Sequence, residues 1–278
     1  MRANPEFKSV HGLVGDLGLH TVCKSAKCPN IHECWGRSTA TFMILGNICT
    51  RSCKFCAVPP GRPAGVDRDE PRRVAEACGR MKLKHVVITC VTRDDLPDGG
   101  AGIFAETIMS VRAEVPGISI EVLTSDFQGN VNDVAAVLEA RPDVFSHNLE
   151  TVRDLQKEIR PRASYATSLA VLKYAAEWPA RTAVKSGVMV GLGETDDEVI
   201  EAMKDLFDSG VRLLTIGQYL QPTRTHRPVE RYVSPETFKM YEQRAKEIGF
   251  LGVAAGPMVR SSYRADELLA LAKAERAK

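Results

Sequence analysis

The chain has 278 residues, of which 44% are hydrophobic and 26% are charged, and its formal net charge is +2. This composition is typical of a globular protein and gives enough residues for one barrel-sized domain with extensions. The charge is too small to indicate a nucleic acid or a membrane surface as a partner, and no apolar run of about 18 residues predicts a transmembrane helix.

The N-terminal residues lack the apolar segment of a secretory signal, which predicts a cytoplasmic protein. Thiols stay reduced in that compartment, so clustered cysteines indicate metal binding or catalysis instead of disulfides. Six of the eight cysteines lie between residues 23 and 56 and form two groups of three. A structural zinc takes four ligands. A 4Fe–4S cluster held by three cysteines leaves one iron open to a substrate or a weaker ligand.

Residues 1–40 are predicted to form an N-terminal extension that carries the first triad, Cys23, Cys28 and Cys34. The spacing Cys-x4-Cys-x5-Cys suits a cluster that an extension wraps, separate from the one at the second triad. A structural zinc is the alternative reading of the same three cysteines.

The second triad, Cys49, Cys53 and Cys56, follows a predicted strand at Thr41–Leu45 with the spacing Cys-x3-Cys-x2-Cys. In a β/α barrel, the loops after the strands form the catalytic rim. The loop can hold three irons but contains no fourth thiolate, and its flanking cations suit an anionic cluster. A zinc knuckle completed by a distant histidine or cysteine is the alternative.

Short apolar strands alternate with amphipathic helices from residue 41 to residue 220, which predicts an α/β fold. The predicted strands are Thr41–Leu45, His85–Val91, Ser119–Thr124, Val144–Asn148, Thr182–Val190 and Leu213–Tyr219. The helices expected between them are Arg72–Met81, Ile103–Val115, Val131–Ala140, Ser164–Trp178 and Thr195–Ser209. Six β–α units predict a parallel sheet curled into a partial (β/α)6 TIM-type barrel, with a flat doubly wound sheet as the competing arrangement.

The C-terminal part, residues 221–278, is expected to be an extension with one helix at Pro235–Ile248 and another from Ala265. The chain is thus predicted to have an N-terminal extension, a barrel at 41–220 and this C-terminal extension. We find no internal repeat and no low-complexity segment.

The second triad, with an aromatic residue before its last cysteine, resembles the signature of the radical S-adenosylmethionine superfamily. The resemblance implies a 4Fe–4S cluster whose open iron chelates S-adenosylmethionine. Electron transfer would then cleave this cofactor to methionine and a 5′-deoxyadenosyl radical. Residues at strand ends are expected to contact the cofactor: Gly99, Gly100, Asn148, Glu150 and Gly191. Ordinary turns explain the glycines nearly as well.

A wider set of segments, over about residues 18–265, is similar to the lipoyl synthase family. They are His20–Cys23, Cys28–Asn30, Glu33–Trp35, Arg93–Gly100, His147–Thr151 and Gly256–Tyr263. The family's usual Lys-Pro-x-Trp segment upstream of the first cysteines is missing, so the completeness of the N-terminus stays open. No expected ligand is lost with it.

This resemblance implies a sulfurtransferase that inserts two sulfur atoms at carbons 6 and 8 of an octanoyl chain on a carrier-protein lysine. A second, auxiliary 4Fe–4S cluster at the first triad would be the sacrificial sulfur donor. Its fourth ligand would come from the Arg-Ser-Ser-Tyr motif, as Ser262 or Ser261, and we favour Ser262. A hard oxygen ligand is a poor match for iron in a sulfide cluster, which would let one iron leave. Capping of the helix near Ala265 is the alternative role of these serines.

The partners implied are octanoylated lipoyl-carrier domains, namely 2-oxoacid dehydrogenase E2 subunits and the glycine cleavage H protein. An electron donor such as flavodoxin or ferredoxin and a cluster-assembly carrier would also be needed, and neither nucleic acid nor membrane is expected. Two other functions stay open: a radical enzyme whose auxiliary cluster only passes electrons or holds substrate, and a non-enzymatic iron–sulfur or zinc protein. Cys78 and Cys90 are predicted to be small buried hydrophobic residues. Arg160 and Arg162 could bind a carboxylate at the barrel mouth, but a solvated loop is the favoured prediction for them.

Overall fold

A sheet of eight strands runs through the protein, in a computed structural model that describes residues 5–25, 28–36 and 41–276. The strands are β1 (His20–Thr21), β2 (Thr41–Ile44), β3 (His85–Cys90), β4 (Ser119–Leu123), β5 (Val144–Ser146), β6 (Ala183–Val190), β7 (Leu213–Gln218) and β8 (Gly252–Gly256). Their order in the sheet is their order along the chain. β2 to β8 pair in parallel, and β1 is antiparallel to β2. The predicted six-stranded parallel unit, β2 to β7, is confirmed.

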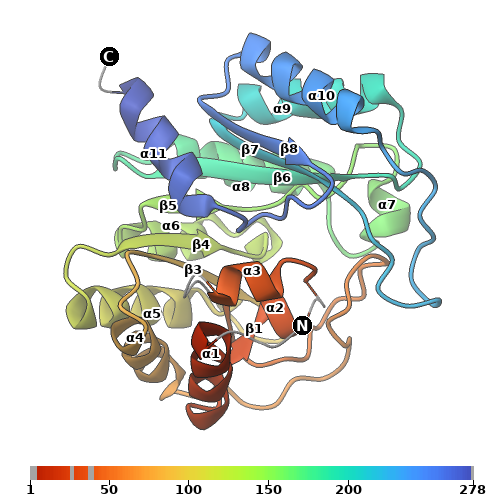
Figure 1. Cartoon of the computed structure of the whole chain (residues 1–278). Helices are drawn as coiled ribbons and strands as arrows, with labels where there is room; N and C mark the ends of the chain where they lie inside the picture. The colour runs from red at the N-terminus through yellow and green to blue at the C-terminus, as the bar shows by residue number, and fades with distance from the viewer. Residues whose placement is uncertain (1–4, 26–27, 37–40, 277–278) are drawn as a thin grey trace.

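The helices between the strands cover the outside of the curled sheet (Figure 1). They are α4 (Glu70–Arg80), α5 (Ala101–Glu114), α6 (Val131–Glu139), α8 (Tyr165–Glu177), α9 (Asp196–Asp208) and α10 (Pro235–Ile248). Each of these predicted helices is confirmed to within two residues at either end. The start of α9 is fixed by a capping box, in which Thr195 and Glu198 bond to each other's backbone N–H groups. We find no helix in the described part of the chain that is long and apolar enough to cross a bilayer.

The remaining helices lie at the two ends of the chain or in short connections. They are α1 (Pro5–Asp16), α2 (Val22–Ser25), α3 (Ile31–Gly36), the 3-10 helix η1 (Phe127–Gly129), α7 (Gln156–Ile159) and α11 (Ala265–Arg276). The central strands are apolar and buried, with every residue of β2, β5 and β7 buried, as expected for a parallel sheet covered on its outer face.

The two expected extensions each add one strand to the sheet. The expected boundary at residue 40 lies outside the described residues, and past residue 220 the chain returns to the sheet as β8 beside β7. The stretch after β8 then crosses toward α3 before α11 begins (Figure 1). Gly217 in β7 permits this crossing, because a Cβ there would lie 2.3 Å from the carbonyl oxygen of Val259.

Candidate functional site

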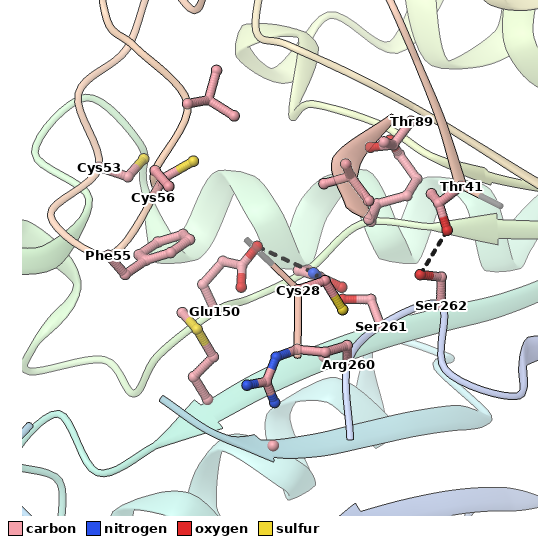
Figure 2. A pocket seen from close by; sticks show the side chains of 18 of the residues that line it. Cys28, Thr41, Cys53, Phe55, Cys56, Thr89, Glu150, Arg260, Ser261 and Ser262 are labelled. Atoms are coloured by element: carbon pink, nitrogen blue, oxygen red, sulfur yellow. Dashed lines mark hydrogen bonds between the residues drawn. The ribbon is translucent and has the colours of Figure 1, made fainter. Parts of the chain in front are cut away.

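Both cysteine triads face one cavity of about 480 Å³ at the carboxyl end of the sheet. Its walls contain all six predicted cysteines and both serines of the C-terminal motif. In Figure 2, Cys53 and Cys56 lie to one side of this space with Phe55, and Cys28 and the two serines lie to the other. Residues separated by more than 200 positions in the sequence therefore meet at one site.

The cysteine loop, residues 49–56, follows β2 and is held in shape by its own backbone. The Cys49 N–H donates to the Pro59 carbonyl at 2.9 Å, and the Cys56 N–H donates to the Cys53 carbonyl at 3.2 Å. The Arg51 N–H points to the Cys49 sulfur at 3.4 Å. Burial raises the pKa of Cys53, and raises that of Cys56 to about 12. Both are therefore neutral thiols in the metal-free chain, and metal binding would release their protons.

A salt-bridged arginine fastens this loop to the two neighbouring strands. The guanidinium of Arg51 makes paired hydrogen bonds of 2.8 Å with Asp94, which follows β3. It makes another pair of 2.7 Å with Asp126, which follows β4. The sequence reading missed this arrangement, because neither carboxylate is near Arg51 along the chain.

The first triad is built from two short helices. Cys23 lies in α2, Cys34 lies in α3, and Cys28 lies between them, with its N–H donating to the Cys23 carbonyl at 3.0 Å. Cys23 is buried, which raises its pKa, and a hydrogen bond from the Thr41 backbone to its sulfur acts in the opposite direction.

The C-terminal motif packs directly on this triad. Asn30 donates to the Met258 carbonyl at 2.7 Å, and the Tyr263 hydroxyl donates to Glu33 at 3.0 Å. The Thr41 hydroxyl donates to the Ser262 hydroxyl at 2.9 Å (Figure 2). Thr41 thus touches both Cys23 and Ser262, which places Ser262 beside the first triad.

The other serine points toward the middle of the cavity. The Asn148 side-chain N–H₂ donates to Ser261 at 2.7 Å and to Glu150 at 3.1 Å. Burial raises the pKa of Glu150, although nearby Arg160 opposes this shift. Asn148, Glu150 and Arg160 all line the cavity, so the prediction of a solvated loop at Arg160 was wrong: this side chain is buried and donates to the Leu149 carbonyl at 3.0 Å.

The three glycines expected to contact the cofactor are not among the residues that line the cavity. Gly99, Gly100 and Gly191 all have positive φ, which suits glycine in a turn. At Gly191 a Cβ would lie 2.2 Å from the Gln218 side chain and 2.6 Å from the Arg231 carbonyl. Close packing at the strand end therefore accounts for that glycine. Cys90, predicted to be a buried hydrophobic residue, does line the cavity, and burial raises its pKa to about 12.

The donors at this site fit two iron–sulfur clusters and a polar organic cofactor. Each triad offers three thiols, and the oxygen of Ser262 lies beside the first. Within the described residues, two buried polar atoms of the cavity wall lack a hydrogen-bond partner: Oδ1 of Asn148 and Nε of Arg160. Such atoms are rare unless a bound group satisfies them, and S-adenosylmethionine has both donors and acceptors. No three His, Cys, Asp or Glu side chains of the described ranges surround a position for a single metal ion.

His147 shows how tightly this wall is packed. The ring is 2% exposed, and its two nitrogens lie 3.0 Å from the Thr124 carbonyl and 3.0 Å from the Ser168 hydroxyl. Burial lowers the pKa of His147 to about 4, and the charge of Arg160 acts in the same direction. The ring is therefore neutral at pH 7.

We expect His147 to make the protein less stable in mild acid. The unfolded chain takes up this proton near pH 6.5 and the folded chain only near pH 4, so protonation favours unfolding. The free energy of unfolding should fall by up to roughly 3 kcal/mol between these pH values from this residue alone. Denaturant titrations across the range measure the slope. His147→Gln should flatten it, and an equally steep slope in that variant would contradict the assignment.

The comparisons with known proteins were made on the whole chain. Residues 43–206 match the family model of the radical SAM superfamily. The lipoyl synthase of Rubrobacter xylanophilus is 54% identical over 263 residues, which cover 95% of this chain and 82% of that protein. The lipoyl synthase of Bacillus subtilis is 50% identical over 268 residues, which cover 96% and 90%.

Two solved structures show the same fold. Methylornithine synthase aligns with a TM-score of 0.59 and 14% identity, covering 89% of this chain and 74% of that chain. The FeFe-hydrogenase maturase HydG from Carboxydothermus hydrogenoformans aligns with a TM-score of 0.61 and 16% identity, covering 82% and 56%. At these identities the likeness concerns the fold alone, and it confirms the partial barrel.

Proposed function

The chain belongs to the lipoyl synthase family of the radical SAM superfamily, and from this we propose that it inserts sulfur at carbons 6 and 8 of a protein-bound octanoyl-lysine. One observation carries the proposal: both cysteine triads and the serine pair face a single cavity. Sulfur insertion requires a radical source and a sulfur source that reach one substrate chain. A shared cavity meets that requirement.

We assign one cluster to each triad. Cys49, Cys53 and Cys56 would hold the cluster that binds S-adenosylmethionine. The first triad together with Ser262 would hold the auxiliary cluster. When bound, these groups supply hydrogen abstraction by a 5′-deoxyadenosyl radical and the sulfur atoms that replace the hydrogens.

The chain's own residues would bind the cofactor and the substrate chain and hold the serine ligand in place. Asn148 and Arg160 offer one acceptor and one donor without protein partners, and these suit the polar groups of S-adenosylmethionine. Apolar side chains such as Phe55, Met189 and Leu220 line the same cavity and suit an octanoyl chain. Thr41 holds the Ser262 hydroxyl beside Cys23.

We further propose which proteins are the partners and which part of the chain serves each cluster. The substrates would be lipoyl-carrier domains, specifically 2-oxoacid dehydrogenase E2 subunits and the glycine cleavage H protein. Flavodoxin or ferredoxin would supply electrons, and a cluster-assembly carrier would rebuild the consumed cluster, all in the cytoplasm. Residues 1–40 and 221–278 would serve the auxiliary cluster, and residues 41–220 the radical chemistry.

The proposal is tested with anaerobically reconstituted protein, dithionite, S-adenosylmethionine and an octanoyl-lysine peptide. We expect a dithiolated peptide and two 5′-deoxyadenosine molecules per product, both measured by mass spectrometry. If 5′-deoxyadenosine forms without thiolation, the substrate assignment is wrong. If neither product appears in iron-loaded protein, the enzyme assignment is wrong.

A further inference from the structure

Three loops around the second triad contain basic side chains and no acidic ones. Residues 46–66, 159–164 and 219–229 include no Asp or Glu, although the whole chain is nearly balanced at +2. Their arginines and lysine are Arg51, Lys54, Arg62, Arg160, Arg162, Arg224 and Arg227. These three segments therefore carry seven positive charges and no negative one.

The fold brings these loops into contact. The Lys54 N–H donates to the Ile159 carbonyl at 2.8 Å, and the Arg227 N–H donates to the Lys54 carbonyl at 3.0 Å. Arg162 donates to the Thr50 carbonyl at 2.8 Å. The cysteine loop thus lies between the other two loops, and their charges surround it.

Some of these cations are already neutralised and some are not. Arg51 pairs with Asp94 and Asp126, and Arg227 pairs with Glu158. Lys54, Arg162 and Arg224 are exposed, and none of them pairs with a carboxylate in the described part of the chain. We call these three side chains the cationic rim.

The cationic rim lies on the outer side of the cysteine loop. Lys54 stands between Cys53 and Cys56, which both line the cavity, but no member of the rim lines it. The cavity wall instead includes Leu220 and Arg260. A protein bound to the rim would therefore approach the cysteines from outside without blocking the cavity.

We infer that the cationic rim is the docking surface for an acidic one-electron donor protein that reduces the cluster at the second triad. The inference rests on the proposed function, because cleavage of S-adenosylmethionine consumes one electron each time. The donor loses that electron and the cluster gains it, so two donor oxidations accompany each lipoyl group. Opposite charge on the donor would speed its encounter with the rim and orient it there.

The test compares two sources of electrons with the reconstituted holoenzyme. Reduced flavodoxin of strongly negative charge is the protein donor, and dithionite is the small-molecule donor. Arg224→Glu should lower the rate of 5′-deoxyadenosine formation per unit of flavodoxin by about five- to tenfold at low salt. The dithionite-driven rate should not change. Arg162→Glu should act in the same direction, and salt should slow the wild-type flavodoxin reaction.

Lys84→Glu is the matched control. Lys84 is also exposed, but it directly precedes β3 and so lies at the opposite end of the barrel from the cysteine loop. The control should leave both rates unchanged. The inference is overturned if flavodoxin-driven rates in the Arg162 and Arg224 variants equal the wild type. It is also overturned if these variants weaken only the use of an octanoylated carrier domain under dithionite. Loss of dithionite-driven thiolation in the wild type would instead refute the proposed function.

Discussion

Arg51→Ala should lower the free energy of unfolding by about 3–5 kcal/mol, because it leaves the buried carboxylate of Asp126 and the half-buried carboxylate of Asp94 without their cation. The Arg51 side chain is 5% exposed and that of Asp126 is 2% exposed. Burial alone would raise the pKa of Asp126, but hydrogen bonds from Arg51 hold it below its ordinary value. Denaturant unfolding of the wild type and the variant at pH 7 measures the difference.

An exposed arginine provides the matched control. Arg72 lies 2.7 Å from Asp69, the same distance that separates Arg51 from Asp126, but the Arg72 side chain is 64% exposed. Solvent screens such a pair, so Arg72→Ala should leave the unfolding transition nearly unchanged. If Arg51→Ala costs no more stability than Arg72→Ala, the buried network does not fasten the cysteine loop.

The same variant should also impair cluster loading. Arg51 joins the cysteine loop to the ends of β3 and β4, so its loss frees the loop that carries three cluster ligands. We expect less iron bound per chain after reconstitution, measured by iron analysis and by the visible absorbance of the cluster. Mutation of a residue that supports metal ligands commonly weakens the affinity for the metal by about 10- to 100-fold.

The barrel was predictable because each of its units repeats the same local pattern. An apolar strand buried on both faces and a helix with a capping residue are both visible in the sequence, as at Thr195. β8 was missed because Gly252–Gly256 holds small residues with little apolar character, and its pairing with β7 depends on tertiary contact. β1 has only two residues, which leaves no period to detect.

The cysteines of the site were predictable from spacing, whereas the polar network was not. Asp94 and Asp126 are 43 and 75 positions from Arg51 along the chain. Each is one carboxylate among many in the sequence, and only the curl of the sheet brings them together. Arg160 looked like a loop residue because nothing local shows that backbone carbonyls and a cavity wall will enclose it.

Ser262→Cys should separate cluster assembly from sulfur transfer. A thiolate is a softer and tighter ligand for iron than a serine oxygen. The auxiliary cluster should therefore assemble fully but release its fourth iron poorly when the cluster is attacked. We expect unchanged iron content and continued 5′-deoxyadenosine formation, with lipoyl product lower by about 100-fold, the upper end of effects around metal ligands. Iron analysis and product mass spectrometry measure both quantities on one sample.

Ser261→Cys distinguishes the two neighbouring serines, because their contacts differ. Thr41 contacts both Ser262 and Cys23 of the first triad. Ser261 instead accepts a hydrogen bond from Asn148 near the centre of the cavity. If position beside the triad decides which oxygen binds iron, Ser261→Cys should reduce lipoyl formation less than tenfold. The reverse order of effects would move the ligand to Ser261. Unchanged lipoyl formation in both variants would show that no serine needs to leave the cluster, and the sacrificial role of that cluster would have to be given up.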